Sequence, residues 1–247
     1  MPVITRLLFA NLLLCWGLMA QAAPLRVVTE PWAPYVFVKG GQPTGLDYEI
    51  ANEVFRRLGV EVRWEFLPWR RCLMMVEQGQ ADGVLDIFQT RDRAPLLIYP
   101  DHPLSEVEFV LFQANARRHS VQRLTDLRGL SVGTQAGFQY GPAFDDAPQF
   151  RREPAPTLQA NLGKLVLGRI DLLITDRRAG RFAVKELGLQ GQVRELPWVV
   201  ARHPQYLALR RGAGLDKLMV RFDTELQRYR ASRHYPMLVR RFTDAPR

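Results

Sequence analysis

Strand and helix patterns alternate along the first third of the chain, and this alternation restricts the protein to an α/β fold. Residues 25–29 form a short apolar strand pattern. Apolar residues then recur at every fourth position from Leu46 to Leu58, which is the spacing of one helical face, and Gly59 follows as a C-cap. A further strand, helix and strand are predicted at 60–66, 69–78 and 83–88. This order implies a parallel sheet with right-handed crossovers.

The same alternation restarts further along, which bears on the number of sheets. The expected elements are a strand at 130–133, a helix at 157–167, a strand at 170–175 and a helix at 215–229. With 247 residues, 47% of them apolar, the chain can bury one large core or two modest ones. The restart favours two sheets over one.

The first 22 residues have the features of a secretory signal peptide. Arg6 supplies the positive start, residues 7–18 are an apolar run, and Ala20-Gln21-Ala22 offers a small-x-small cleavage site. A membrane anchor is the alternative, but the apolar run is short for a membrane span. Lipidation at Cys15 is disfavoured by the bulky leucine before it. We therefore predict cleavage after Ala22 and a soluble periplasmic monomer.

The charge and the cysteine content narrow the function classes. The net charge is +9, but the arginine pairs are scattered along the chain, which is typical of a solvated basic surface and not of a nucleic-acid interface. Cys72 is the only cysteine after the leader, so no internal disulfide is expected and a buried packing role is predicted for it. The sequence has no nucleophile elbow, zinc-binding helix or paired-cysteine spacing. We therefore expect no catalytic residue, metal or cofactor.

A set of segments resembles the bacterial extracellular solute-binding proteins of family 3, the type II periplasmic binding proteins typified by polar amino-acid receptors. The likeness covers nearly the whole mature chain. Its most specific part is the segment from Gly45 to Leu58, which departs from the family pattern only in side-chain size at Tyr48 and Phe55. The other segments are TEPWAPYVF, GQADGVLDIF, TRDR, LRGLSVGTQAG and GRIDLLITD.

The resemblance implies two α/β lobes, two strand crossovers between them, and a ligand held in the cleft that closes by hinge motion. The crossovers are expected near 109–114 and 206–210. Lobe 1 then comprises residues 23–111 plus 209–247, and lobe 2 comprises residues 112–208.

Aromatic and basic side chains are expected on the lobe 1 side of the cleft. Trp69 follows a strand at the edge where open α/β sheets bind ligands, and Trp32 lies in the loop after the first strand, so the two rings are candidates for an aromatic slot. The alternative for Trp69 is that it covers the lobe 1 core. Arg93 in TRDR matches the family arginine that holds the ligand carboxylate through two parallel N–H donors, and Arg91 is the neighbouring candidate. Phe88 ends the adjacent strand.

Three carboxylates are further candidates for ligand contact. Asp176 ends a strand where amino-acid receptors carry the acid that pairs with the ligand ammonium, although it also suits the N-cap of the following helix. Glu30 occupies the acidic position in the first loop. Asp86 stands where such receptors usually have a small residue, so either an ion pair with Arg93 or contact with a cationic ligand group is open.

Lobe 2 is expected to contribute the turn from Gly133 to Gly137. The family uses the backbone N–H groups of this turn for an anionic ligand group, which would direct Gln135, Gly137, Phe138 and Tyr140 to the cleft. No Lys-Ser or Lys-Thr follows, so a nucleotide-binding loop has little support.

The expected function is capture of a small polar or anionic solute, an amino acid or related carboxylate, for the membrane subunit of an ABC transporter. Fold alone does not decide function. The alternatives are a secreted enzyme similar to cyclohexadienyl dehydratase, using Glu30, Asp86 or Asp176, and a ligand-sensing module.

Overall fold

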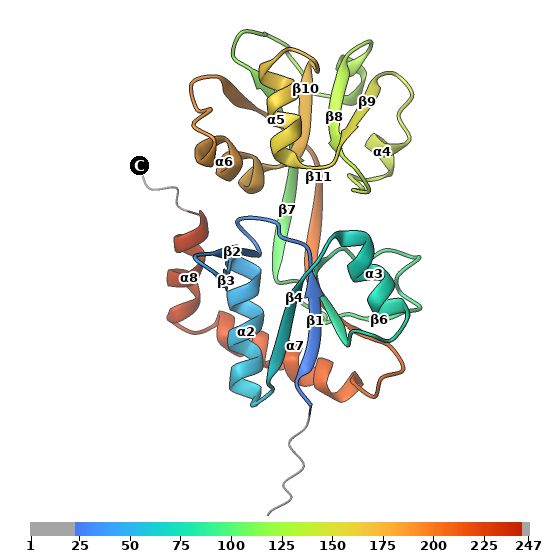
Figure 1. The fold of residues 1–247 in the computed structure, drawn as a ribbon, viewed down its shortest axis with the longest axis vertical. Helices are drawn as coiled ribbons and strands as arrows, with labels where there is room; N and C mark the ends of the chain where they lie inside the picture. The colour runs from blue at the N-terminus through green and yellow to red at the C-terminus, as the bar shows by residue number, and fades with distance from the viewer. Residues whose placement is uncertain (1–22, 244–247) are drawn as a thin grey trace, which may run out of the picture.

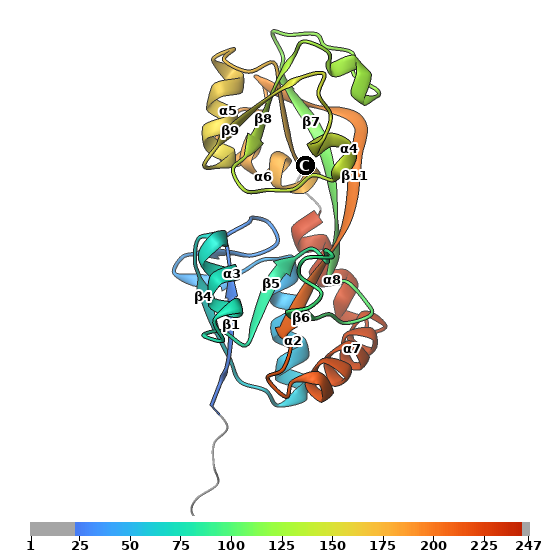
Figure 2. The same cartoon turned by 90° about the vertical axis from the view of Figure 1, so that its right-hand side faces the viewer.

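The computed structural model describes residues 23–243, so the predicted signal peptide lies outside the described residues. Two groups of helices and strands lie one above the other and are joined by the long strands β7 (Ser105–Ala114) and β11 (Val193–Arg210), as Figures 1 and 2 show. The elements of the lower group are β1 (Leu25–Thr29), β2 (Phe37–Lys39), β3 (Gln42–Thr44), α2 (Leu46–Leu58), β4 (Val62–Phe66), α3 (Trp69–Glu77), β5 (Gly83–Ile87), β6 (Leu97–Ile98), α7 (Asp216–Arg230) and α8 (His234–Thr243). Those of the upper group are η1 (Leu124–Leu127), β8 (Ser131–Gln135), α4 (Pro142–Asp145), β9 (Arg151–Ala155), α5 (Leu158–Val166), β10 (Leu172–Asp176) and α6 (Arg177–Glu186).

Nine of the described strands form one hydrogen-bonded series that passes through both groups, in the order β4-β1-β5-β11-β7-β10-β8-β9, with β6 also paired to β11. Strands β2 and β3 pair only with each other, as a separate antiparallel sheet. Pairing within each group is parallel where β1 meets β4 and β5, and where β8 meets β9 and β10. The two connecting strands pair antiparallel with each other and with β5 and β10. Each group therefore has the parallel-rich sheet expected for it, and the two sheets are continuous with each other because β7 and β11 are long enough to belong to both groups.

The predicted elements of the first βαβαβ unit are all present, with ends within two residues of the expected ones. Helix α2 begins after Gly45, whose φ of 128° and close approach to the carbonyl of Tyr35 leave no room for a side chain: a Cβ would lie 2.3 Å from that oxygen. The helix ends at Gly59 in the left-handed conformation, as expected for a C-cap. Helix α3 begins directly after Pro68, which fixes the direction of chain entry.

Buried apolar side chains fill the space between the sheet and its helices. In the lower group, Phe55 of α2 packs on Phe222 of α7 with ring centroids 4.9 Å apart. Cys72 of α3 is fully buried beside Met75, as the sequence predicted. Within residues 23–243, no helix combines the length and the apolarity that crossing a membrane requires.

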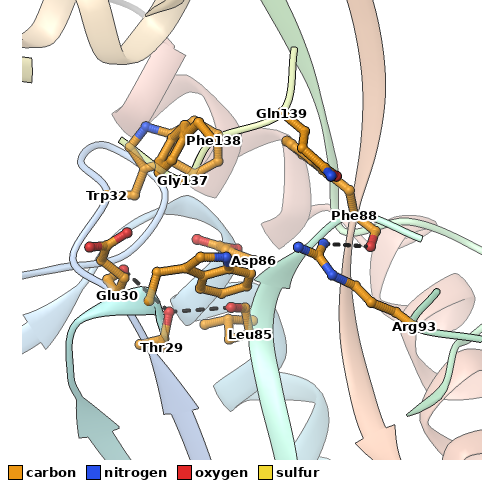
Figure 3. Close-up of a pocket in the computed structure, with 11 residues that line it drawn as sticks. Thr29, Glu30, Trp32, Leu85, Asp86, Phe88, Arg93, Gly137, Phe138 and Gln139 are labelled. Carbon is orange, nitrogen blue, oxygen red and sulfur yellow. Dashed lines mark hydrogen bonds between the residues drawn. The ribbon is translucent and has the colours of Figure 1, made fainter. Parts of the chain in front are cut away.

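The pairing also locates the passage between the two groups. Residues 109–112 of β7 already pair with β10 of the upper group, and residues 206–209 of β11 pair with β5 of the lower group. The loop after β1 and the turn after β8 face each other beside these strands (Figure 3). The fold thereby brings the carboxyl ends of strands from both groups to one place.

Candidate ligand-binding site

A narrow cavity lies between the two groups. Its walls come from the end of β1 and the following loop, the start of α3, the end of β5 with its following loop, and the turn after β8 (Figure 3). The lining residues are Thr29, Glu30, Trp32, Trp69, Leu85, Asp86, Phe88, Arg93, Gly137, Phe138 and Gln139. Its free volume is about 40 Å³, well below the roughly 300 Å³ at which ligand cavities usually begin.

Aromatic rings narrow the cavity and close it between the groups. Trp32, from the loop after β1, contacts Phe138 of the upper group edge to face at 5.6 Å and Phe88 at 6.3 Å. Trp69 lines the cavity from the first residue of α3. Both tryptophans singled out in the sequence therefore lie at one cavity. The contact between Trp32 and Phe138 blocks the space between the groups.

Arg93 supplies a cation at the wall formed by the loop after β5. Its Nη1 donates a 3.1 Å hydrogen bond to the carbonyl of Phe88, and its guanidinium lies 5.4 Å from the centre of the Trp69 ring. Burial lowers the pKa of Arg93, but an arginine stays charged at any physiological pH. Arg91 is exposed and does not line the cavity. The structure thus separates the two candidates.

Asp86 is a buried carboxyl at the floor of the cavity. It is 8% exposed and has φ of 62°, the left-handed region that few non-glycine residues adopt. Neither of its oxygens has a hydrogen-bond partner among the described residues. Because Arg93 donates to Phe88 instead, the ion pair considered between Asp86 and Arg93 is not formed.

Glu30 is the second acid at the cavity. It is partly buried, and burial raises its pKa, an effect that the backbone N–H of Trp69 partly offsets. Glu30 and Trp32 also line a neighbouring cavity of about 440 Å³ that extends toward α5 and α6. Gln135 faces this neighbouring cavity and not the narrow one.

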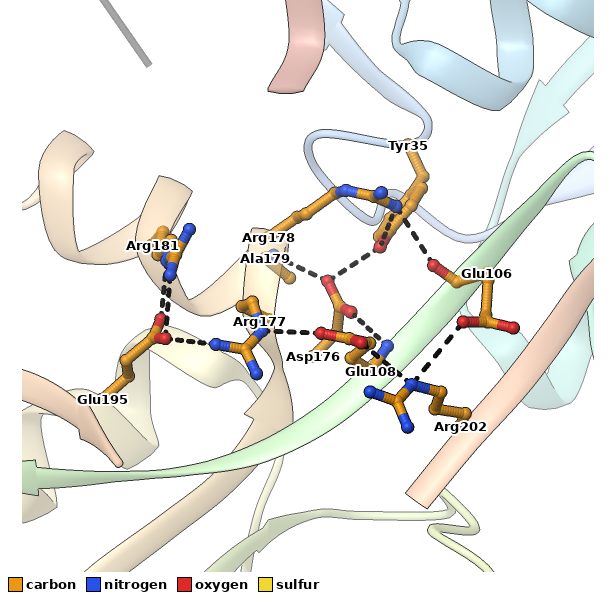
Figure 4. Close-up of polar contacts among 10 residues, drawn as sticks. All are labelled: Tyr35, Glu106, Glu108, Asp176, Arg177, Arg178, Ala179, Arg181, Glu195 and Arg202. Atoms are coloured by element: carbon orange, nitrogen blue, oxygen red, sulfur yellow. Dashed lines mark hydrogen bonds and ion pairs between the residues drawn. The ribbon is translucent and has the colours of Figure 1, made fainter. Parts of the chain in front are cut away.

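Asp176 is used by protein groups. Its side chain caps α6 by accepting from the N–H of Ala179 at 2.8 Å, and it also accepts from the hydroxyl of Tyr35 at 3.0 Å and the N–H of Glu108 at 3.1 Å (Figure 4). The residue is 1% exposed and does not line the cavity. Burial raises the pKa of Asp176 to about 6. The N-cap alternative is therefore observed in this conformation, and ligand contact by Asp176 stays a prediction.

Tyr140 is also directed away from the cavity. It is buried, and its hydroxyl accepts the N–H of Gln135 at 2.7 Å, which ties the turn after β8 to the segment before α4. Its neighbours Phe138 and Gln139 line the cavity instead. Sequence reasoning missed Gln139, Thr29 and Leu85; Thr29 and Leu85 were recognisable only as strand residues.

Tyr35 was also missed, although the segment TEPWAPYVF contains it.

Within residues 23–243, no group of three or more His, Cys, Asp or Glu side chains has the arrangement of a metal site. The cavity therefore offers aromatic faces, one cation and two carboxyl groups.

This arrangement agrees with the comparison of the chain with known families. The sequence model of the bacterial extracellular solute-binding proteins, family 3, matches residues 25–244. The chain belongs to this family. No curated protein gives a significant match to the sequence.

Solved structures of the same fold include amino-acid receptors and a sensor. A mutant of ArgBP from T. maritima has a TM-score of 0.77 at 19% identity, covering 90% of this chain and 95% of its own. The amino-acid ABC transporter substrate-binding protein AbpA from Streptococcus pneumoniae, bound to L-arginine, has a TM-score of 0.75 at 21% identity over 89% and 94%. A histidine kinase sensor domain similar to periplasmic binding proteins has a TM-score of 0.76 at 20% identity over 90% and 96%. The fold is that of the type II periplasmic binding proteins.

Proposed function

We propose that the protein captures a small polar solute, an amino acid or a related carboxylate, between its two lobes and delivers it to an ABC transporter in the periplasm. The observation that carries this proposal is the cavity between the lobes, which combines tryptophan faces with a buried guanidinium in a member of a solute-binding family. Solved structures of the same fold are named as amino-acid receptors. The proposed lobes are residues 23–111 plus 209–247 and residues 112–208.

Arg93 is the proposed partner of the ligand carboxylate. The Phe88 carbonyl holds the guanidinium and the Trp69 ring flanks it, so its orientation is already set before a ligand arrives. A guanidinium offers parallel N–H donors to both oxygens of a carboxylate. The rings of Trp32, Trp69, Phe88 and Phe138 then supply the apolar contact area that orients the rest of the ligand.

Ligand entry requires the lobes to separate. The free volume of about 40 Å³ does not admit an amino acid, and the contact between Trp32 and Phe138 bridges the two lobes. Rotation about the segments where β7 and β11 pass between the lobes would break this contact and open the cavity. The described conformation therefore corresponds to a closed clamp.

A sensing role is the second candidate, because a histidine kinase sensor domain shares the fold over 90% of this chain. The binding step is the same in both roles, and what differs is the partner that recognises the closed form. We do not propose an enzymatic activity, because the family whose model matches the chain is one of solute-binding proteins and solved structures of the same fold are named as such.

Binding is tested by calorimetry and thermal shift on the exported protein with a panel of L-amino acids, small dicarboxylates and polyamines. A ligand that binds only the folded state raises the melting temperature, and we expect at least one amino acid to bind with one site per chain. Recovery of that ligand chemically unchanged after long incubation separates a receptor from an enzyme. Failure of every panel member to bind, or conversion of a bound one, would overturn the proposal.

A further inference from the structure

Two buried carboxyl groups lie together beneath the cavity. Asp47, the second residue of α2, is fully buried, and Asp86 of β5 is 8% exposed and lines the cavity. The two side chains are within hydrogen-bonding reach of each other. Only one of the pair is in contact with the space that a ligand would occupy.

The hydrogen bonds around the pair indicate that the two carboxyl groups share one proton. The hydroxyl of Ser105 donates to Oδ2 of Asp47 at 2.7 Å. Oδ1 of Asp47 and both oxygens of Asp86 accept no well-formed hydrogen bond from the described residues, and the donor nearest to Asp86 is the neutral amide of Gln205. Ionised carboxylates are acceptors only, so two of them cannot satisfy each other. A proton on one of the two acids converts that contact into a hydrogen bond.

The surrounding charges decide which acid holds the proton. Arg178 of α6 and Arg230 of α7 both favour the ionised form of Asp47, as does the Ser105 hydroxyl. Tyr35, after β1, also lies near Asp47, whose negative charge contributes to raising the pKa of the tyrosine.

Asp86 faces Asp47 and the buried amide of Gln205 on β11, and no cation of the described residues donates a hydrogen bond to it. Burial first, and then the negative charge of Asp47, raise the pKa of Asp86 well above its ordinary value, and burial raises that of Asp47 to about 7. The Ser105 hydroxyl and the nearby arginines thus favour the ionised form of Asp47, which places the shared proton on Asp86.

We propose that a cationic group of the ligand binds against Asp86 and displaces this shared proton, so that Asp86 selects cationic ligands and binding releases one proton. The inference rests on the proposed solute-binding function. In the step, the O–H bond of Asp86 breaks, the proton leaves to solvent, and the cation takes its place against the carboxylate. The charge of the site with its ligand is the same as that of the protonated site. A neutral ligand leaves the proton where it is.

The exchange predicts a pH dependence with a definite sign. Below the pKa of the pair, affinity for a cation rises with pH, by up to about tenfold per unit for one released proton. Affinity for a neutral ligand stays flat over the same range. Asparagine tolerates the left-handed conformation that Asp86 adopts, so Asp86→Asn is compatible with the backbone at this position.

The first measurement needs no ligand. We compare infrared spectra of the full mature protein and of its Asp86→Asn variant, both at neutral pH. The difference spectrum should contain the band of a protonated carboxylic acid that belongs to the wild type alone. Its absence from the wild type would overturn the shared proton even if the protein binds amino acids well. Its presence together with failure of every panel ligand would remove the proposed function and leave the buried pair.

The second measurement counts protons. Calorimetry with L-arginine as the cationic probe and L-glutamine as the neutral one is run in two buffers of different ionisation enthalpy. We expect release of close to one proton with arginine and none with glutamine. Asp86→Asn should weaken arginine binding at least tenfold more than it weakens glutamine binding. The proton release with arginine should also disappear in this variant.

Asp47→Asn is the variant matched to Asp86→Asn. The amide introduced at position 47 can donate to the carboxylate of Asp86, so Asp86 stays ionised without a shared proton. This variant should still bind arginine, but with no proton release and a flat pH profile from 6 to 8. Arginine binding without proton release in the wild type, or equal release in Asp86→Asn, would refute the exchange.

Discussion

Removal of the Tyr35 hydroxyl tests the contact between the lobes. Tyr35 is fully buried and lies in the loop after β1, whereas its acceptor Asp176 lies at the start of α6 (Figure 4). Tyr35→Phe removes one oxygen atom, the 3.0 Å bond to Asp176 and the 3.4 Å bond from Arg178. It creates almost no cavity, so the loss of hydrogen bonding dominates the change in the free energy of unfolding.

The size of that change depends on pH, because the acceptor titrates. A hydrogen bond to an ionised group contributes about 1.5–3 kcal/mol, whereas a neutral one contributes about 0.5–1.5 kcal/mol. Asp176 has a pKa of about 6 in the folded protein, raised from 3.8 by burial, and the Tyr35 hydrogen bond lowers it. Without the Tyr35 hydroxyl the pKa of Asp176 rises further. The free energy of unfolding of the variant therefore falls most at pH values where Asp176 is ionised. We expect a penalty of about 2–3 kcal/mol at pH 8 and about 1 kcal/mol at pH 4.5.

The same shift sets the pH dependence of the wild type. An acid with a raised folded pKa contributes stability that is present below its unfolded pKa and is lost as pH rises through its folded pKa. For Asp176 this contribution disappears between about pH 4 and pH 6, the interval given by its two pKa values. Tyr35→Phe steepens this loss and extends it to higher pH.

Urea denaturation followed by tryptophan fluorescence at pH 4.5 and pH 8 measures both quantities. Tyr140→Phe is the matched control: that hydroxyl is also buried but accepts a backbone N–H from Gln135, so its loss should cost the same at both pH values. Equal penalties for Tyr35→Phe at the two pH values would refute an ionised acceptor. A penalty below that of Tyr140→Phe at pH 8 would refute the contact between the lobes.

Three further predictions concern single side chains. Arg93→Ala should weaken binding of an anionic ligand by about 2–5 kcal/mol, roughly thirtyfold to several-thousandfold, while the exposed Arg91→Ala changes it little; calorimetry showing wild-type affinity for Arg93→Ala would exclude the carboxylate contact. Gly180→Ala would place its Cβ 2.3 Å from a phenylalanine ring of β7 and should destabilise the protein by about 1–3 kcal/mol in urea denaturation. Gly163→Ala has nothing within 4 Å of its Cβ and should stabilise the protein by about 0.5–1 kcal/mol in the same assay. A more stable Gly180→Ala than Gly163→Ala would contradict the packing. Burial raises the pKa of Cys72 to about 12, so alkylation at pH 8 should be slow in the native protein and fast in urea, and rapid native labelling would show that the thiol is exposed.

The local elements were predictable because short-range patterns determine them. The fourfold spacing of Leu46, Ile50, Val54 and Leu58, followed by Gly59, identified α2 to the residue. The joining of the strands into one series was not predictable in the same way. It depends on β11, an 18-residue strand interrupted by register shifts near Val199 and Tyr206, where the sequence suggested only a short crossing. Periodicity does not reveal which partners a long strand has along its length.

The site was predictable by residue type but not by orientation. Trp32, Trp69 and Arg93 line one cavity because each follows a strand at the same edge of the sheet, which the order of elements indicates. Asp176 also ends a strand, yet its carboxylate is turned to Tyr35 and to the N–H groups around it. That outcome depends on a tyrosine 141 residues earlier in the chain, a contact for which the sequence has no local signal.

Arg178 connects the lobe contact with the buried carboxyl pair. Its guanidinium donates to the Tyr35 hydroxyl and to the carbonyl of Glu106, and its charge favours the ionised forms of both Asp176 and Asp47. Arg178 belongs to α6 of the upper lobe, whereas Asp47 belongs to α2 of the lower lobe. If the lobes separate, Asp47 therefore loses a nearby positive charge and its pKa rises. Closure around a ligand restores that charge, which lowers the free energy needed to ionise the pair at the moment when a ligand cation requires it.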